Sequence, residues 1–471
     1  MRKRYIILDD LHGSVALEQP EWDLVNTRWF QRLRRIHQLG LASMVFPGAE
    51  QTRFAHSVGV FHLASRLGRR LREEDHISEQ DEKELRAAAL LHDIGHFPFS
   101  HTIESVYEDL AGKSPTQYLK AETLTEMEDT GPGTTSASHC QFHEDFGRRI
   151  LADADDDNSP GKVLRSCDLD PQRLGAIIVG AHENVLLNQI VHSDLDVDQL
   201  DYLLRDAKAT GSAYGLYDLN YLMECIDVVY WGGAPQLCVR FQGLHPLEHY
   251  VLSKYFYYVC ILYQKTRCAL EGLLQALAVN LISAGRLPSW SDVETQLADG
   301  SLWEFDDVAV LAAIREVAGD NTAGAQVRDA AHMLLERRVL KVDAEEHRPD
   351  SGAPYGPVLE PGIDWNPILK KAARRAGLQS FTVLKEKLRD PEEAGASKQA
   401  QLEVELRTDG TPIRLLVEPP YAIPPDTPSV PATDRSGEVA GRLVLLESLG
   451  DTVVGRLAGH TTYISRLYRP A

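Results

Sequence analysis

Residues 88–101 of the chain read AALLHDIGHFPFSH, and this stretch decides how the sequence is interpreted. The acidic, serine-led segment before it predicts a helix over residues 77–94. Four titratable side chains follow one another at the end of that helix and in the Gly- and Pro-containing turn after it: His92, Asp93, His96 and His101. Neutral imidazoles and carboxylates are the groups that bind divalent metals. Because these groups are flanked by apolar residues, we expect a functional site rather than core filler.

A second group of candidate residues lies in HSDLDVDQLDYLLRD (residues 192–206). Asp198, Tyr202 and Asp206 are four positions apart, so on a helix they share one face. That face offers a potential metal carboxylate, an aromatic ring and a further hydrogen-bond acceptor. An acidic helix start stabilised by the helix dipole is the alternative, and it explains the earlier aspartates of the segment but not Tyr202 and Asp206.

Composition bounds the class of protein. A chain of 471 residues usually exceeds one compact core, so two domains or a core with large additions are expected. Its 43% apolar and 25% charged residues are typical of a soluble globular protein. The net charge of −20 argues against broad nucleic-acid binding, which needs clustered cations. The arginine-rich segment 27–40 is either a solvated helix face or a phosphate-binding surface.

The sequence also constrains the compartment. No apolar run approaches the length of a membrane span, and the N-terminal segment is too short and too acidic for a signal peptide. We therefore expect no membrane partner and a cytoplasmic location. The six cysteines form no CxxC pair and are expected to be reduced and structural.

Helical periodicity dominates the first part of the chain, and a loop or insertion is expected at about residues 110–138. Segments rich in Pro, Asp and Gly follow near residue 342, together with the strand-like stretches QLEVEL, IRLLVE and GRLVLLES. The predicted fold class is mainly α: a helical body over 1–340 and a smaller α+β portion with Pro-rich loops over 341–471. Helices are expected at 20–40, 55–75, 77–94, 171–185, 196–208, 218–228, 245–283, 306–317 and 324–340.

The order of His56, then His92-Asp93, then Asp198 resembles the HD-domain metal-dependent phosphohydrolases. Within them the chain most resembles the deoxynucleoside triphosphate (dNTP) triphosphohydrolases, the dGTPase-like group that includes the vertebrate SAM-and-HD-domain enzyme, and no SAM domain is expected. The matched stretches are FQRLRRIHQLG, VFPGAEQTRFAHSVGV, LLHDIGHFPFSH, HEDFG, DVDQLDYLLRDAKATG, LLERRVLK and GHTTYISRLYRP.

The resemblance implies an HD-type helical fold and an activity, the hydrolysis of dNTPs to deoxynucleoside and tripolyphosphate. It assigns a divalent metal, of the iron, manganese, magnesium or zinc kind, to four ligands: His56, His92, Asp93 and Asp198. Without the resemblance, His56 would be interpreted as a core or capping histidine. His101 and His143 match family histidines near the phosphates and are candidates for proton transfer to the leaving group. His96 matches another active-site histidine.

Substrate contacts follow from the same resemblance. Gln38 and Leu39 match the pair that contacts the deoxyribose and excludes a ribose hydroxyl. Tyr202 and Asp206 match the sugar-stacking ring and the acceptor of the 3′-hydroxyl. Arg53 matches a phosphate-contacting arginine, as expected because a buried triphosphate needs cations.

The chain departs from the family pattern at three places. In YQKTR (residues 263–267), Gln264 stands where the family has a histidine. Gln199 stands where relatives carry a Lys or Arg that faces the triphosphate. Asn26 stands where an aspartate of the vertebrate-type regulatory site reads guanine, although Gln31 and Arg34 are retained. We expect an activating nucleotide of unspecified base and, since relatives are usually oligomers, a homo-oligomer.

Other functions stay open at this stage. A different HD phosphohydrolase (a nuclease, a phosphodiesterase or a nucleotidase) is one alternative, although neither the acidic pair of alarmone hydrolases nor the GYP signature of cyclic-dinucleotide enzymes is present. A catalytically silent nucleotide sensor is the other, and it would predict broken metal ligands, whereas all four are intact.

Overall fold

The computed structural model describes most of the chain. The insertion expected at 110–138 lies, after its first three residues, outside the described part. No helix in the described part is both long and apolar enough to cross a membrane. The described residues are 4–112, 142–152, 158–193, 195–339, 341–349, 401–405, 414–418, 427–446, 449 and 461–469.

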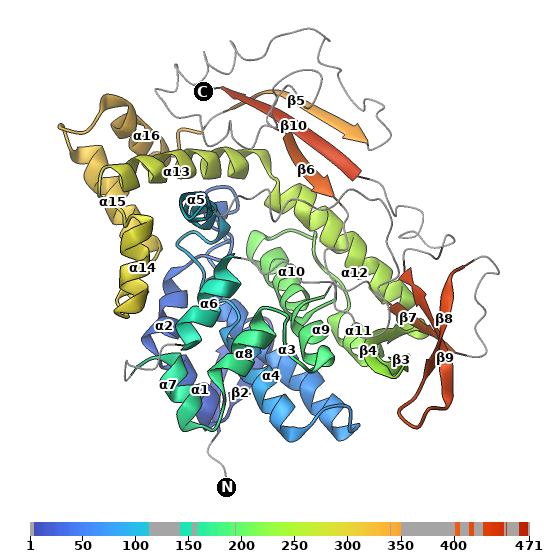
Figure 1. Ribbon diagram of the computed structural model, residues 1–471. Coiled ribbons are helices and arrows are strands. Elements are labelled where there is room, and N and C mark those ends of the chain that lie inside the picture. Colours follow the sequence, from blue (N-terminus) through green and yellow to red (C-terminus); the bar gives the residue numbers. More distant parts are fainter. Residues whose placement is uncertain are drawn as a thin grey trace.

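Helices make up the body of the molecule, as the sequence predicts (Figure 1). A π-helical turn, Tyr258–Leu262, separates two of them, α12 and α13. The helices are α1 Gln19–Val25, α2 Arg28–Arg32, α3 Arg53–Glu73, α4 Glu79–Leu91, α5 His101–Leu110, α6 Phe142–Ala152, α7 Pro160–Ser166, α8 Pro171–Ile178, α9 Val185–Val191, α10 Val197–Thr210, α11 Leu219–Cys225, α12 Leu244–Tyr257, α13 Lys265–Ser283, α14 Trp290–Ala298, α15 Asp307–Gly319 and α16 Ala325–Leu335.

Local capping explains several helix ends. Ser78 and Asp81 form a reciprocal capping box at the start of α4. Gly211, with a φ of 68°, ends α10 in the left-handed conformation that glycine adopts without strain. The single helix expected over 20–40 is wrong. The Thr27 side chain accepts a hydrogen bond from the Phe30 N–H and caps a new helix, α2, which begins at Arg28, three residues after the end of α1.

The strands form three groups. An N-terminal hairpin pairs β1 (Tyr5–Asp9) with β2 (Gly13–Leu17). A three-stranded sheet has the order β5 (Lys341–Pro349), β10 (Thr461–Arg469), β6 (Gln401–Glu405). A closed barrel has the order β3 (Ile226–Trp231), β4 (Ala234–Arg240), β7 (Arg414–Val417), β9 (Val439–Leu445), β8 (Ser429–Thr433).

The barrel corrects the predicted C-terminal portion in two respects. Its strands β3 and β4 come from a stretch before residue 340, where a helix over 218–228 was expected; that helix ends at Cys225, and Gly232 and Gly233 form the hairpin turn at positive φ. Among the described residues after 340 there are strands and no α-helix, so only the β part of the expected α+β portion is confirmed. The three strand-like stretches do contain β6, β7 and β9. The division at residue 340 stays a prediction.

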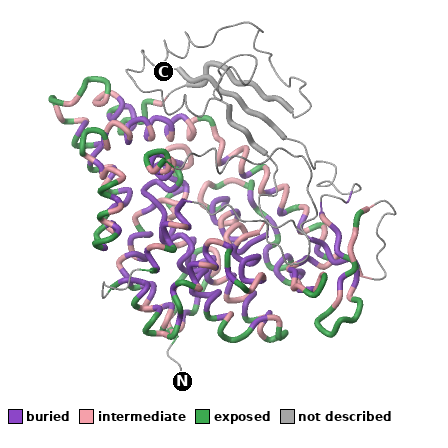
Figure 2. The backbone as a smooth tube through the Cα atoms, in the orientation of Figure 1, coloured by how far each residue is buried: buried purple, intermediate pink, exposed green. Residues whose placement is uncertain are grey.

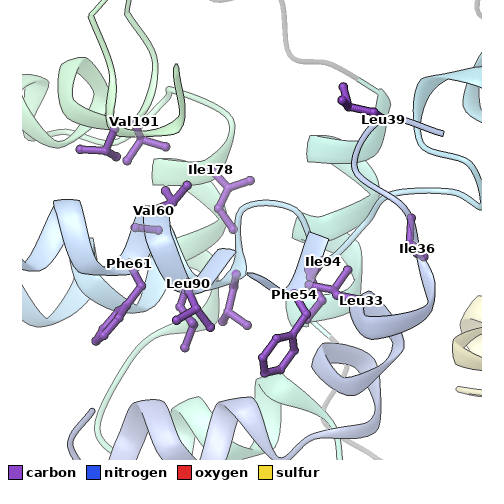
Figure 3. Packing of buried hydrophobic residues seen from close by; sticks show 14 of the residues in the cluster. Leu33, Ile36, Leu39, Phe54, Val60, Phe61, Leu90, Ile94, Ile178 and Val191 are labelled. Atoms are coloured by element: carbon purple, nitrogen blue, oxygen red, sulfur yellow. The ribbon is translucent and has the colours of Figure 1, made fainter. Parts of the chain in front are cut away.

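The apolar core lies between the helices of the body, where buried residues concentrate along α3 and its neighbours (Figure 2). Figure 3 shows Val60 and Phe61 of α3 close to Leu90 of α4 and Ile178 of α8. All four side chains are fully buried. Because α3 is packed along much of its length, the polar residues that it carries are held in fixed positions.

Candidate active site

The four predicted metal ligands converge on one point. His56 lies in the first turn of α3, His92 and Asp93 follow the end of α4, and Asp198 lies in the first turn of α10. Nε2 of His56 is 2.8 Å from Oδ1 of Asp198 and 3.8 Å from Oδ2 of Asp93. Nε2 of His92 is 3.4 Å from Oδ1 of Asp93 and 4.0 Å from Oδ1 of Asp198.

This donor set fits a divalent cation. The Nε2 atoms of His56 and His92 are buried, yet neither has a hydrogen bond of suitable geometry among the described residues. Burial lowers the pKa of His56, but Asp198 and Asp201 outweigh burial and raise it to about 10. The point between these side chains therefore attracts positive charge, and two imidazoles with two carboxylates are a ligand set that suits iron, manganese or zinc.

Asp201, which the sequence did not single out, fixes the orientation of His56. Its Oδ2 lies 2.8 Å from Nδ1 of His56, and Arg205 donates to the same oxygen. Burial raises the pKa of Asp201, but Arg205, His12 and His56 hold it well below its usual range, so the carboxylate only accepts. Nδ1 of His56 therefore carries a hydrogen, and Nε2 is the atom that faces the point between His56, His92, Asp93 and Asp198, named the cation point below. The three-residue spacing from Asp198 to Asp201 on one helix is the signal that sequence analysis missed.

Arg53 begins α3 and joins the cation point to the turn before α5. It donates to Oδ2 of Asp93 at 2.7 Å and to Oγ of Ser100 at 2.8 Å. Phe99 and Ser100 both have positive φ, which is strained for residues other than glycine. Asp307 holds this turn by accepting the Phe99 N–H at 2.6 Å. The expected phosphate contact of Arg53 stays a prediction, and its position beside Asp93 is compatible with it.

A second cluster adjoins the first and centres on Glu104, a residue that sequence analysis also missed. Oε1 of Glu104 is 2.8 Å from Nδ1 of His143, and Oε2 is 3.2 Å from Nδ1 of His96 and 3.1 Å from Nδ1 of His101. Nε2 of His96 lies 3.1 Å from Oδ1 of Asp93, so the two clusters touch. Only His101 is well exposed, with 64% of its side chain accessible.

The electrostatics of this cluster are set by burial and by neighbouring charge. Burial, with the charges of Arg53 and His143, lowers the pKa of His96 to about 3, so that His96 is neutral at pH 7. Burial raises the pKa of Glu104, but His143 and His101 hold it well below its usual range. The arrangement places imidazole side chains, a common group for proton transfer, directly beside the cation point.

Asp206 is buried on α10, further along the helix than the ligand Asp198. Oδ1 accepts from Gln51 at 2.8 Å and Oδ2 accepts from the Tyr257 hydroxyl at 2.5 Å. Burial raises the pKa of Asp206 to about 6, against the opposing effect of these two hydrogen bonds. The ring of Tyr202 lies 5.5 Å from that of Tyr257. Tyr257 thus contacts both residues that are predicted to share a face: its hydroxyl donates to Asp206, and its ring lies beside that of Tyr202.

Gln38 and Leu39 lie in the segment before α3. The Gln38 N–H donates to the Gln51 carbonyl at 3.0 Å, which brings Gln38 close to the partner of Asp206. Oε1 of Gln38 is buried without a hydrogen-bond partner among the described residues, and Leu39 is buried. Gln199 is engaged with its own surroundings, since Nε2 donates to the Ser193 carbonyl and Oε1 accepts from Tyr250.

The three predicted regulatory residues lie close together at α1 and α2. Nε of Arg34 donates to Oε1 of Gln31 at 2.9 Å, and Gln31 donates to the Val25 carbonyl, next to the exposed Asn26. The Arg34 guanidinium lies over the ring of Phe54, 3.4 Å from its centroid. Nothing in these contacts tests nucleotide binding, which stays a prediction.

Comparison with known proteins shows what the region of the site is similar to. The model of the HD domain matches residues 53–206, the span that contains all four predicted ligands. The uncharacterized protein YwfO of Bacillus subtilis is 34% identical over 272 residues, 57% of this chain and 54% of that protein. A protein of Dictyostelium discoideum named deoxynucleoside triphosphate triphosphohydrolase SAMHD1 homolog is 30% identical over 279 residues, 57% of this chain and 48% of that protein.

The fold has solved relatives as well. A crystal structure of a phosphohydrolase from Bacteroides thetaiotaomicron superposes with a TM-score of 0.66 at 21% identity, covering 99% of this chain and 100% of that one. At this identity the match establishes the fold alone. The chain spans about half the length of the curated relatives that it matches.

Proposed function

We propose that the chain, whose residues 53–206 match the HD domain, hydrolyses dNTPs to deoxynucleoside and tripolyphosphate; the similarity to a protein named as a dNTP triphosphohydrolase homolog supports this proposal. The observation that carries the proposal is the convergence of His56, His92, Asp93 and Asp198 beside a second, histidine-rich cluster. A divalent cation held by these four residues supplies positive charge that polarises a phosphate group and lowers the pKa of water.

The chain's own residues account for phosphate binding and proton transfer. Arg53, fixed against Asp93, contributes a positive charge at the edge of the cation point, where a phosphate oxygen needs one. Glu104 accepts from Nδ1 of His143 and thereby leaves Nε2 of that ring free. His101 is the exposed member of the cluster, and a leaving 5′-oxygen takes its proton from this group of imidazoles.

Selection of a deoxynucleotide is assigned to the residues around Asp206. Its carboxylate accepts the 3′-hydroxyl, and the Tyr202 ring covers the sugar. Gln38 and Leu39 are assigned to the side of the 2′ carbon, where the buried apolar side chain of Leu39 disfavours an added hydroxyl.

A nucleotide that activates the enzyme at Asn26, Gln31 and Arg34 is a further part of the proposal. It is supported by the proximity of the three residues to one another. The homo-oligomer, the cytoplasmic location and the lack of nucleic-acid partners stay predictions.

The test is a product analysis with the purified chain. Each dNTP and rNTP is incubated singly and in mixtures with Mn²⁺ or Mg²⁺, and nucleoside, mono- and diphosphates and tripolyphosphate are resolved. We expect dNTPs, but not rNTPs, to be hydrolysed to nucleoside and tripolyphosphate. If an activating nucleotide is required, hydrolysis should occur only in the mixtures. His92→Ala should abolish turnover, whereas His76→Ala, a histidine beyond the opposite end of α3, should not. Monophosphate or diphosphate products would assign another HD phosphohydrolase activity, and no turnover would favour a nuclease or a silent sensor.

A further inference from the structure

We propose that His12, in the turn of the hairpin β1–β2, is a positioning residue that sets the cation affinity of the candidate active site. It acts through Asp201 on the orientation of His56. The inference rests on the metal site of the proposed function and deepens it, because it gives a role to a hairpin that lies outside the matched HD domain.

The carboxylate of Asp201 is saturated by four N–H groups. Oδ1 is 2.6 Å from Nε2 of His12 and 3.0 Å from Nη2 of Arg205. Oδ2 is 2.8 Å from Nδ1 of His56 and 2.8 Å from Nε of Arg205. Because the ionised carboxylate only accepts, both imidazoles donate to it. His12 and His56 thus hold opposite oxygens of the same carboxylate.

Burial makes this arrangement hard to replace with water. The side chains of His12, Asp201 and Arg205 are 5%, 0% and 1% exposed. If the donor at position 12 is removed, Oδ1 of Asp201 keeps only Arg205 and is left under-satisfied in a buried position. The carboxylate then rotates or shifts toward a new donor, and the bond from its other oxygen to His56 is lengthened. Outer hydrogen bonds of this kind commonly change metal affinity 10–100-fold.

The hairpin turn is built to present His12 to Asp201. Oδ1 of Asp9 accepts the backbone N–H groups of Leu11 at 3.0 Å and His12 at 2.8 Å, which fixes the turn. Oδ2 of Asp9 accepts from Nη1 of Arg205 at 2.9 Å. One guanidinium therefore ties together the turn and the carboxylate that His12 contacts.

A face of the His12 ring packs on α3, while its Nε2 atom contacts Asp201. The ring of His62 stacks on it with centroids 5.0 Å apart. Burial lowers the pKa of His62 to about 4, so that it packs as a neutral ring. His12 is therefore held on both sides, and the hydrogen bond to Asp201 is its directed contact.

The discriminating question is whether a donor or merely volume is needed at position 12. His12→Gln keeps an N–H donor, whereas His12→Met fills a similar volume without one. Asp10→Ala is the matched control on the same turn, since Asp10 bonds Arg205 at 3.1 Å but does not contact Asp201. Each full-length variant is stripped of metal with a chelator, and its affinity for Mn²⁺ alone is measured by titration followed by electron paramagnetic resonance. Thermal unfolding of the metal-free proteins is recorded in parallel.

We expect His12→Met to weaken Mn²⁺ binding at least 10-fold, His12→Gln to stay within about threefold of wild type, and Asp10→Ala to bind like wild type. Equal affinities of the Gln and Met variants would overturn the inference, as would weakening by Asp10→Ala to the same extent as by His12→Met. Since the readout is metal binding, wild-type affinity in all variants refutes the role of His12 while leaving the proposed activity intact. Absence of Mn²⁺ binding by the wild-type protein would refute both.

Discussion

Gly59, one turn after His56 on α3, offers a stringent test of the network around Asp201. A Cβ atom at this position would lie 2.0 Å from Oδ1 of Asp201 and 2.4 Å from Nη2 of Arg205. Both groups are buried and hydrogen-bonded, so neither can swing into solvent. To restore a contact of about 3 Å, the carboxylate of Asp201 has to move by about 1 Å, away from the positions at which it holds His12 and His56.

The expected cost of Gly59→Ala follows from opposing effects. Overpacking of a rigid interior costs about 1–3 kcal/mol, and a weakened hydrogen bond to a charged group costs about 1.5–3 kcal/mol. Alanine in a helix interior gains about 1 kcal/mol over glycine. The free energy of unfolding should therefore fall by about 1.5–5 kcal/mol, although helix propensity alone predicts a gain.

Urea unfolding of the metal-free protein, with Mn²⁺ titration beside it, measures both consequences. Gly319→Ala is the control, because that glycine ends α15 with open space around its Cβ position and should be neutral or slightly stabilised. We expect Gly59→Ala to unfold at lower urea and to bind Mn²⁺ more weakly than either wild type or the control. If Gly59→Ala matches the control in both measurements, the close packing of Asp201 against α3 is wrong.

Two further predictions concern groups away from the cation point. Burial raises the pKa of Glu84, but contacts from His182 at 3.5 Å and Arg173 at 2.9 Å outweigh it and lower the pKa to about 2. Its stabilising contribution, about 1–2 kcal/mol after screening, should be present above about pH 5 and lost as the pH falls toward 2; Glu84→Gln should flatten the acid side of the stability–pH curve in that window. Tyr257→Phe removes a hydrogen bond that lowers the pKa of Asp206, so the pKa should rise and more of the carboxyl group should be protonated at pH 6.5. The rate of dNTP hydrolysis should therefore drop about 10-fold at pH 6.5 and recover toward pH 8. An equal loss at both pH values would contradict this cause.

The metal ligands were accessible to sequence analysis because their order and the HDIGHFPFSH pattern are specific. The residues that orient them were not. Asp201, Glu104 and His12 are ordinary acidic or turn residues until the fold brings His12 and Asp201 within 2.6 Å across 189 positions of sequence. Glu104 likewise reaches His143 across 39 positions. Hydrogen-bond partners of this kind depend on packing and leave no local periodicity.

The barrel failed to emerge from the sequence for a related reason. Strand β4 pairs in parallel with β7, so that Val239 lies opposite Leu415. A contact so distant in sequence has no local signature, whereas the residues just before β3 carry helical spacing and do form α11. The strand-like stretches at β6, β7 and β9 were recognised because apolar and β-branched residues alone are sufficient there.

A row of residues that winds around the first part of α3 connects the features on which the proposals rest. Arg53, His56, Gly59 and His62 follow one another at intervals of three residues on a helix whose other positions are largely apolar. Arg53 contacts Asp93, and His56 is oriented by Asp201. Gly59 leaves space for the Asp201 carboxylate, and His62 stacks on the ring of His12, which contacts that carboxylate from the hairpin. Apolar residues at these positions would make α3 a more ordinary core helix. The polar and small residues are thus explained by the cation point and its supports, and not by the stability of the helix.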